Sequence, residues 1–507
     1  MGLSALRALE LGHIASPHGI TNYSGGLHAA VVSWVFALAG PSTGALRAAG
    51  LVCNAAGVAL AACAIRCASG LPGAAVFLAS ANASLALLLF PRVAWEVAAF
   101  QVLLAALCLG ASVRILTHEG SLLGWSFAYC LAVSLGTASH FIFISLPLSL
   151  LAAAAWLAAL SPRRAFLRLF ALQAAGLGLA AMTYLIKPQI DEQDYLRFRH
   201  LWNLSIWLLL PAAGAACVAC ISQGGRWMAR ARCARARVFK AEAGRSWSLP
   251  GALLGGLAAG VLATANLLFF ENHGAVLLGT VAGHLPVARM GHQAPAFWAL
   301  IAQYVLAGAW LLCAFVGFAW AVLPNRLFPR IRLLPAERLL LLAPLSYFSV
   351  FPLFTEQTAP RYYILANLLL AASFGVLSGR WLCAPQTGIR ALGRGAVAAL
   401  AAGLVAAQAT HWSLAGSDEL RPPIRIEYAG YQDTSEHFLK LEELEERLRE
   451  DGACEIRASG FFIEFPLAFL RRVRPYPCRP GIWAEVHYCR DCLEPPRYFS
   501  VRVHASP

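Results

Sequence analysis

The sequence predicts an all-α polytopic membrane protein of about twelve transmembrane helices, followed by a small C-terminal α+β domain. Hydrophobic residues make up 59% of the chain and charged residues 13%, whereas soluble domains carry roughly 25% charged residues. Apolar runs near the length that spans hydrocarbon recur over residues 1–412. Residues 418–507 instead hold 16 Asp+Glu and 13 Lys+Arg, with no such run. We therefore expect a transmembrane domain over 1–412 and a separate domain over 418–507.

The first apolar segment, residues 27–39, is too short to cross the membrane and is predicted to be an interfacial helix. The apolar runs after it predict the following spans: 46–66, 72–90, 93–115, 122–137, 140–160, 167–187, 201–222, 249–270, 294–322, 338–353, 362–380 and 394–412.

Basic residues fall mainly in alternate loops, and this bias sets the orientation by the positive-inside rule. The predicted cytoplasmic loops hold 19 Lys+Arg and the other loops up to residue 412 hold 8. The N-terminal 45 residues and the tail after Trp412 then face outward, so the C-terminal domain is predicted to be extracytoplasmic. Because the net charge of +14 lies largely in membrane loops, nucleic acid is not expected as a partner. The Ala- and Arg-rich composition is typical of a bacterium with GC-rich DNA, which predicts the inner membrane.

Acidic and histidine side chains gather on the predicted outer face. Outer loops up to residue 412 hold seven acids and cytoplasmic loops hold three, and 12 of the 13 histidines lie outside. Groups that can do acid, base or metal chemistry are therefore concentrated on one side. The alternative explanation is that acids merely avoid the positively charged side.

Four stretches on the outer face carry a resemblance to a known family. Residues 9–28 hold an acid followed by a Gly-His, Pro and Gly pattern, and residues 40–47 lead into a span through Ser42 and Leu46-Arg47. Residues 91–96 read Pro-Arg-Val-Ala-Trp-Glu, and residues 359–363 read Ala-Pro-Arg-Tyr-Tyr. With these motifs the sequence resembles the GT-C superfamily of membrane glycosyltransferases, which includes the protein O-mannosyltransferases and the lipid A aminoarabinose transferases. The resemblance covers most of residues 1–412.

The resemblance implies transfer of a sugar from a polyprenyl-phosphate-linked donor to a lipid, glycan or protein acceptor at the outer face. An acid removes the proton of the acceptor hydroxyl, and Glu10 is the acid in the first segment. Arginine stabilises the leaving phosphate, for which Arg361 is the first choice and Arg92 the second. Further residues are expected to line the cavity: His13, His18, Tyr23, Glu96, His140 and Tyr362.

Several of these assignments have a plainer alternative. Arg361 beside Tyr362 also fits an interfacial anchor. Arg92 and Glu96 are one helical turn apart and also fit a simple ion pair. His140 also fits an interfacial histidine whose hydrogen bonds are satisfied within the protein.

No metal site and no cofactor are predicted. The outer histidines are loosely spaced, and no His-Glu-x-x-His run occurs in the sequence. A bound divalent metal remains the less favoured alternative.

The chain departs from the family at its start. Members of the family begin with a transmembrane helix that is followed directly by the catalytic acid, and no spanning run precedes residue 27 here. We expect a helix and an acidic residue to be encoded just upstream, since the predicted spans place the N-terminus outside. The alternative is a genuine twelve-span protein with a translocated N-terminus and without that base.

The tail predicts a helix over 434–450, with Ser435 as its cap and an apolar stripe from Leu439 to Leu448. Alternation predicts strands at 461–465, at 483–486 and at 498–503. Its four cysteines, Cys454, Cys478, Cys489 and Cys492, favour disulfides in an oxidising compartment. Three pairings are possible, and a zinc knuckle is the alternative.

Two further functions compete with the transferase. A polytopic transporter or lipid flippase without catalytic activity is the main alternative, although ionisable residues at mid-membrane and repeated halves are not evident in the sequence. An assembly factor that lacks the catalytic acid is the other.

Overall fold

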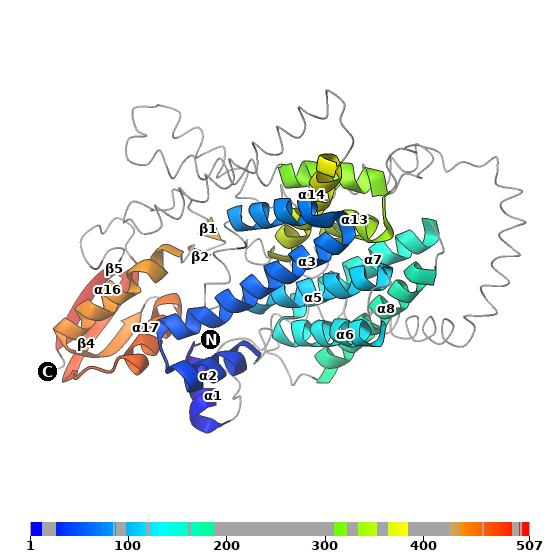
Figure 1. The fold of residues 1–507 in the computed structure, drawn as a ribbon. Helices are drawn as coiled ribbons and strands as arrows, with labels where there is room; N and C mark the ends of the chain where they lie inside the picture. Colours follow the sequence, from blue (N-terminus) through cyan, green and yellow to red (C-terminus); the bar gives the residue numbers. More distant parts are fainter. Residues whose placement is uncertain are drawn as a thin grey trace, which may run out of the picture.

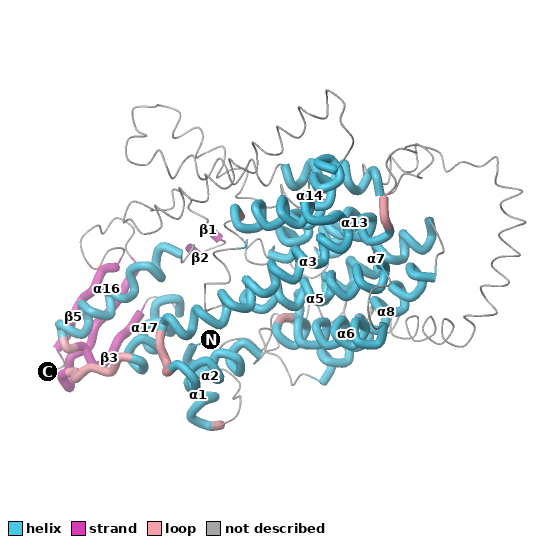
Figure 2. The backbone as a smooth tube through the Cα atoms, in the orientation of Figure 1, coloured by secondary structure: helices cyan, strands magenta, loops and turns pink. Residues whose placement is uncertain are grey.

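The computed structural model describes residues 2–12, 27–84, 87, 98–117, 122–160, 164–186, 309–321, 333–351, 364–383, 427–428, 431–432, 435–458, 461–488, 496 and 499–505. Within them, a helical bundle is accompanied by a small domain of helices and strands, as Figure 1 and Figure 2 show. The predicted spans 201–222, 249–270 and 394–412 lie outside the described residues.

The bundle contains the described parts of the predicted spans. Its helices are α3 (Thr43–Ala83), α5 (Ala98–Thr117), α6 (Leu122–Ser139), α7 (Ser145–Leu160), α8 (Arg164–Ile186), the helix Ala309–Ala321, α13 (Pro335–Val350) and α14 (Ile364–Cys383). Three segments in the described part are long and apolar enough to cross a membrane, namely Thr43–Asn82, Phe100–Thr117 and Ile364–Leu382. Helices therefore form where hydropathy predicted them, while the total of about twelve stays a prediction.

Helix α3 contains the predicted span 46–66 and the part of the span 72–90 up to Ala83, and it breaks between them. Gly70 has φ 83° and ψ 179°, which is not helical; an L side chain would be strained there. The Asn54 side-chain amide, which lies before the break, donates a hydrogen bond of 2.8 Å to the carbonyl of Leu87 beyond it. The predicted boundary between spans 46–66 and 72–90 coincides with this break.

Glycines let α3 and α14 approach closely. A Cβ built on Gly379 would lie 2.6 Å from the Cα of Gly73, and one on Gly375 would lie 2.8 Å from the Gly73 carbonyl oxygen. The two α14 glycines are four residues apart, the small-xxx-small spacing that brings membrane helices into backbone contact.

A buried ion pair joins the first turn of α13 to the last turn of α14. The Arg380 guanidinium donates through Nε and Nη2 to the Glu337 carboxylate, which also accepts the Leu334 amide at 2.7 Å. Glu337 is fully buried. Its place at a helix end, with a partner, differs from the mid-membrane position of ionisable groups in transporters.

Two helices precede the bundle. Helix α2 (Leu27–Ala39) confirms the helix predicted over 27–39, whereas α1 (Gly2–Leu11), with ten residues, was not predicted. Helix α2 is apolar on the face packed against the protein and on its exposed face, where Trp34 is 68% and Leu38 90% exposed. This distribution fits a helix at a lipid interface.

The C-terminal domain contains α16 (Ser435–Asp451), α17 (Phe461–Val473) and the sheet β3-β4-β5. Strand β3 (Ala453–Ala458) is parallel to β4 (Arg479–Tyr488), which pairs antiparallel with β5 (Phe499–Ala505). A separate short ribbon joins β1 (Glu427–Tyr428) and β2 (Tyr431–Gln432). The core consists of Leu444, Leu448, Ala453, Ile463, Leu467, Leu470, Ala484, Val486 and Phe499.

The predicted strand at 461–465 is wrong, because these residues begin α17. Ile463, Leu467 and Leu470 are all buried, and their spacing of four and three residues places them on one helix face. The predicted helix at 434–450 and the strands within β4 and β5 are confirmed, and β3 was not predicted.

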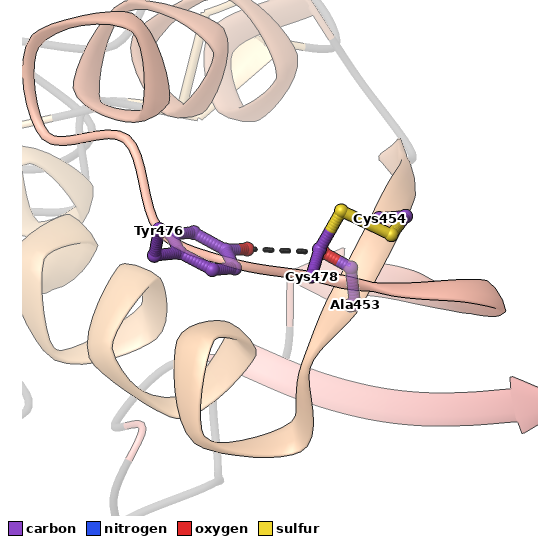
Figure 3. The surroundings of a disulfide bond; sticks show 4 residues. All are labelled: Ala453, Cys454, Tyr476 and Cys478. Carbon is purple, nitrogen blue, oxygen red and sulfur yellow. Dashed lines mark hydrogen bonds between the residues drawn. A yellow bond between two sulfur atoms is a disulfide. The ribbon is translucent and has the colours of Figure 1, made fainter.

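A disulfide joins Cys454 of β3 to Cys478 just before β4, with 5.0 Å between the two Cα atoms. Figure 3 shows this bond beside Tyr476, whose hydroxyl donates to the Ala453 carbonyl at 3.1 Å. Burial raises the pKa of Tyr476, so its hydroxyl remains a donor at neutral pH. The favoured disulfide prediction is confirmed for this pair, while Cys489 and Cys492 lie outside the described residues.

Candidate functional site

The C-terminal domain docks on the N-terminal helices through one apolar cluster. Phe469 of α17 packs with side chains of α1, α2 and the start of α3, and its ring stacks on Phe36 of α2 with 6.0 Å between centroids. The cluster comprises Ala5, Leu6, Val32, Phe36, Ala45, Leu46, Ala49 and Phe469. Figure 1 shows α1, α2 and α17 gathered at the end of the bundle where α3 begins.

This contact places the N-terminal helices and the C-terminal domain on the same side of the membrane. The loops that carry both segments were predicted to lie outside from their charge alone. Segments that pack against each other beyond a helix end cannot lie across a bilayer from one another. The contact supports the shared side and leaves its identity, outer or cytoplasmic, as a prediction.

Glu10, the predicted catalytic acid, lies at this junction. Its carboxylate pairs with the Arg472 guanidinium at 3.0 Å, and both side chains are 52% exposed. Helix α1 thus presents the acid and α17 supplies a cation to it. Sequence reasoning did not single out Arg472, because no local pattern links residues so far apart in the chain.

A second group of polar side chains lies where α2 meets the ends of α5 and α6. A short connection joins α5 to α6 and the two helices pack together, so the start of α5 and the end of α6 share one end of the bundle. Helix α2 contacts both, and the His28 ring meets the Phe100 ring edge-on at 5.2 Å between centroids. Helix α2 therefore connects this group to the docking cluster around Phe36.

The polar side chains at this end are buried and largely uncharged. His28 is 2% exposed, and neither of its ring nitrogens has a hydrogen-bond partner among the described residues. Burial, followed by the positive charge of the chain N-terminus, lowers the pKa of His28 to about 3. The Thr137 hydroxyl is likewise buried and has no partner in the described part of the chain. Gln101 and Ser139 are also buried here.

His140, predicted to line the cavity, has a structural role in the described residues. It precedes the 3₁₀ helix η3 (Phe141–Ile144), and its Nδ1 accepts the Ile142 amide at 3.1 Å. The side chain is 1% exposed. This cap is a structural contact of one ring nitrogen, and the cavity-lining role stays a prediction.

The remaining predicted site residues lie outside the described residues. His13, His18 and Tyr23 precede α2 in the sequence, Arg92 and Glu96 precede α5, and Arg361 and Tyr362 precede α14. Three of the segments that hold predicted site residues thus lead into helices described above.

No group of three or more His, Cys, Asp or Glu side chains that could hold a metal occurs in the described ranges. The arrangement there offers a carboxylate beside an arginine, and neutral donors and acceptors at the bundle end. Such groups can take a proton and bind hydroxyls without a metal.

No family model matches the chain, and no curated protein matches it. Two solved structures are similar to it, both crystal structures of ArnT from Cupriavidus metallidurans. The one bound to undecaprenyl phosphate is 13% identical, with a TM-score of 0.35 over 96% of this chain and 87% of that chain. The apo structure is 12% identical, with a TM-score of 0.38 over 99% and 92% of the two chains. Since both TM-scores are below 0.5, the function is argued from the residues of this chain.

Proposed function

We propose that this protein is a GT-C-type glycosyltransferase that moves a sugar from a polyprenyl-phosphate-linked donor to an acceptor at the outer face of the bacterial inner membrane. The observation that carries the proposal is the convergence of three features at one end of the bundle. The acid Glu10, the docked C-terminal domain and the buried neutral group at His28 all adjoin α1 and α2. A lipid-linked donor presents its sugar at such a membrane boundary.

In the proposed reaction an acceptor hydroxyl oxygen attacks the anomeric carbon of the sugar. The bond from this carbon to the phosphate oxygen breaks, and the configuration inverts. Glu10 takes the hydroxyl proton as general base. The polyprenyl phosphate leaves with the bonding electrons, and Arg361 and Arg92 bind the charge that grows on its oxygens.

The pairing of Glu10 with Arg472 fits this assignment. The Arg472 guanidinium holds the Glu10 carboxylate in one position through this ion pair. Both side chains are half exposed, so the pair is accessible to an acceptor. The same contact also serves docking, and the two roles of Glu10 can be separated by mutation.

The test is release of polyprenyl phosphate by the full-length chain in proteoliposomes that contain polyprenyl-phosphate sugars and bacterial membrane extract. Glu10→Gln is expected to lower turnover by about 100-fold or more, because the base is lost. Arg472→Gln removes the same ion pair and is expected to lower turnover by less than about tenfold, since an exposed pair contributes little stability. Arg447→Gln is the matched control, because Arg447 is an exposed arginine paired with Asp451 on α16.

If Glu10→Gln and Arg472→Gln lower turnover by the same small factor, Glu10 serves docking only and is not the general base. Unchanged release in Arg361→Ala would remove the proposed phosphate ligand. A wild-type chain that turns over no donor in this assay would favour the transporter or flippase.

A further inference from the structure

Two buried polar side chains at the docked end of the bundle have no hydrogen-bond partner among the described residues. They are His28, through both ring nitrogens, and Thr137, through its hydroxyl. They come from α2 and α6, which are in contact, and the His28 ring also meets Phe100 of α5. The His28 and Thr137 side chains therefore belong to helices that meet at this end of the bundle, together with the ring of Phe100.

Burial without a partner destabilises a fold, because the polar atom loses its hydrogen bonds to water. Other buried hydroxyls in these helices avoid this loss within their own helix. Ser33 of α2 donates to the Ala30 carbonyl at 2.7 Å, and Ser112 of α5 donates to the Cys108 carbonyl at 2.8 Å. Since Thr137 makes no such bond, a partner from outside these residues is the simplest explanation for its burial.

The chemistry of the group selects the kind of partner. A neutral imidazole donates at one nitrogen and accepts at the other, and a threonine hydroxyl does both. Burial lowers the pKa of His28 to about 3, so the ring keeps both functions at physiological pH. A sugar hydroxyl likewise donates and accepts. A phosphate accepts only and calls for cations, and residues 27–39, 98–104 and 133–145 contain no lysine or arginine.

We infer that His28 and Thr137 form a subsite for the sugar hydroxyls of the polyprenyl-phosphate donor, an inference that rests on the proposed function. The ring of Phe100 supplies an apolar wall against which a sugar face packs. In this arrangement Arg361 and Arg92 bind the phosphate, and His28 and Thr137 bind the sugar hydroxyls.

Thermal unfolding of the full-length chain in nanodiscs tests the inference. Each variant is measured alone, with undecaprenyl phosphate, and with undecaprenyl-phosphate-linked glucose, mannose or an amino sugar. The sugar-dependent part of the stabilisation is the difference between a sugar-linked lipid and undecaprenyl phosphate. His28→Leu and Thr137→Val are expected to lose it, which corresponds to about threefold to tenfold weaker binding of the sugar-linked lipid.

His28→Gln keeps a donor and an acceptor and is expected to retain most of the sugar-dependent stabilisation. Ser149→Ala is the matched control, since that buried hydroxyl is satisfied within α7. Without ligand, His28→Leu is expected to raise the Tm by about 1–3 °C, because an unpaired buried polar group is removed.

A lower ligand-free Tm for His28→Leu, with its sugar-dependent stabilisation intact, would show that the protein itself satisfies His28 and would overturn the subsite. A wild-type chain stabilised equally by undecaprenyl phosphate and every sugar form would also overturn it, while the donor lipid of the proposed function survives. A wild-type chain stabilised by none of these lipids would overturn the proposed function together with the subsite.

Discussion

His28 lies where a titratable side chain would be expected to be charged or paired, and it is neither among the described residues. Its neutrality follows from burial at the contact of α2 with α5 rather than from a hydrogen bond. An imidazole whose pKa is about 3 is a weak base near pH 7 and holds almost no proton to donate. The proton-transfer role therefore stays with a carboxylate, and Glu10 is the carboxylate nearest in sequence.

The depressed pKa of His28 predicts a pH dependence of folding. Because the folded-state pKa of about 3 lies below the ordinary value of 6.5, the unfolded chain binds the proton first as the pH falls. The stability associated with neutral His28 is fully present above about pH 6.5 and is lost progressively toward pH 3. Between pH 7.5 and pH 5.5 the wild-type chain should lose about 1.4 kcal/mol more unfolding free energy than His28→Gln. Equal losses in denaturant titrations at the two pH values would contradict the buried, neutral state.

Single residues also show where sequence reasoning reaches its limit. Glu10 was chosen because it is the acid of its segment, and its partner Arg472 is 462 residues away. His140 was chosen for its place at a helix end, and the structure adds that its Nδ1 caps η3. Charge and position in the sequence identify candidates, but a tertiary contact decides what each side chain touches.

Among the elements, α3 and α14 depend on backbone contact rather than on large side chains. Gly379→Ala is expected to destabilise the chain by about 1–3 kcal/mol, because the new Cβ meets the Gly73 backbone. Gly110→Ala on α5 is the control, since nothing lies within 4 Å of its Cβ position, and is expected to stabilise by about 0.5–1 kcal/mol. Thermal unfolding in detergent measures both, and equal effects would rule out the close crossing.

Helix α17 shows why a short apolar alternation misled the prediction. Residues 461–465 alternate as a strand does, but the buried set Ile463, Leu467 and Leu470 follows a helical period over a longer window. Pro466 lies within the helix without ending it. The docking face around Phe469 depends on this helix, so the error also concealed the contact between the domain and α1.

Removing the Phe469 ring should loosen the docking of the C-terminal domain without unfolding it. Phe469→Ala deletes the stack on Phe36 and about 3 kcal/mol of packing. Amide exchange in α1 and α2 is then expected to become faster, while exchange in β4 and β5 stays unchanged. Faster exchange throughout the sheet would instead assign Phe469 to the folding of the domain.

For the whole molecule, α2 links the docked domain to the neutral group at the bundle end. His28 and Phe36 are eight residues apart on this helix, which is about 12 Å along its axis. The docking cluster holds one part of α2 and the contact with Phe100 holds another. A movement of the C-terminal domain is therefore expected to shift α2 and so to change the surroundings of His28.

The sequence predicted those features of the architecture that a membrane requires, namely the positions of the long apolar helices. Lipid requires long apolar helices, so hydropathy located the helices around Gly70, α5 and α14. Charge in the loops predicted a common side for the N-terminal segment and the tail, and the contact of α17 with α1 supports this. The residues that make this contact, such as Phe469 and Arg472, were not predictable, because they depend on the fit between two surfaces and not on a periodic pattern in the sequence.

The side of the membrane on which the docked end lies is the claim on which the proposal depends most. Single-cysteine additions, Ala505→Cys in β5 and Leu334→Cys before α13, can be treated with a membrane-impermeant maleimide in right-side-out vesicles. Labelling above that of the unsubstituted chain is predicted for Ala505→Cys in intact vesicles, and for Leu334→Cys only after permeabilisation. Labelling of Leu334→Cys in intact vesicles, with Ala505→Cys protected until permeabilisation, would contradict a transferase that works at the outer face.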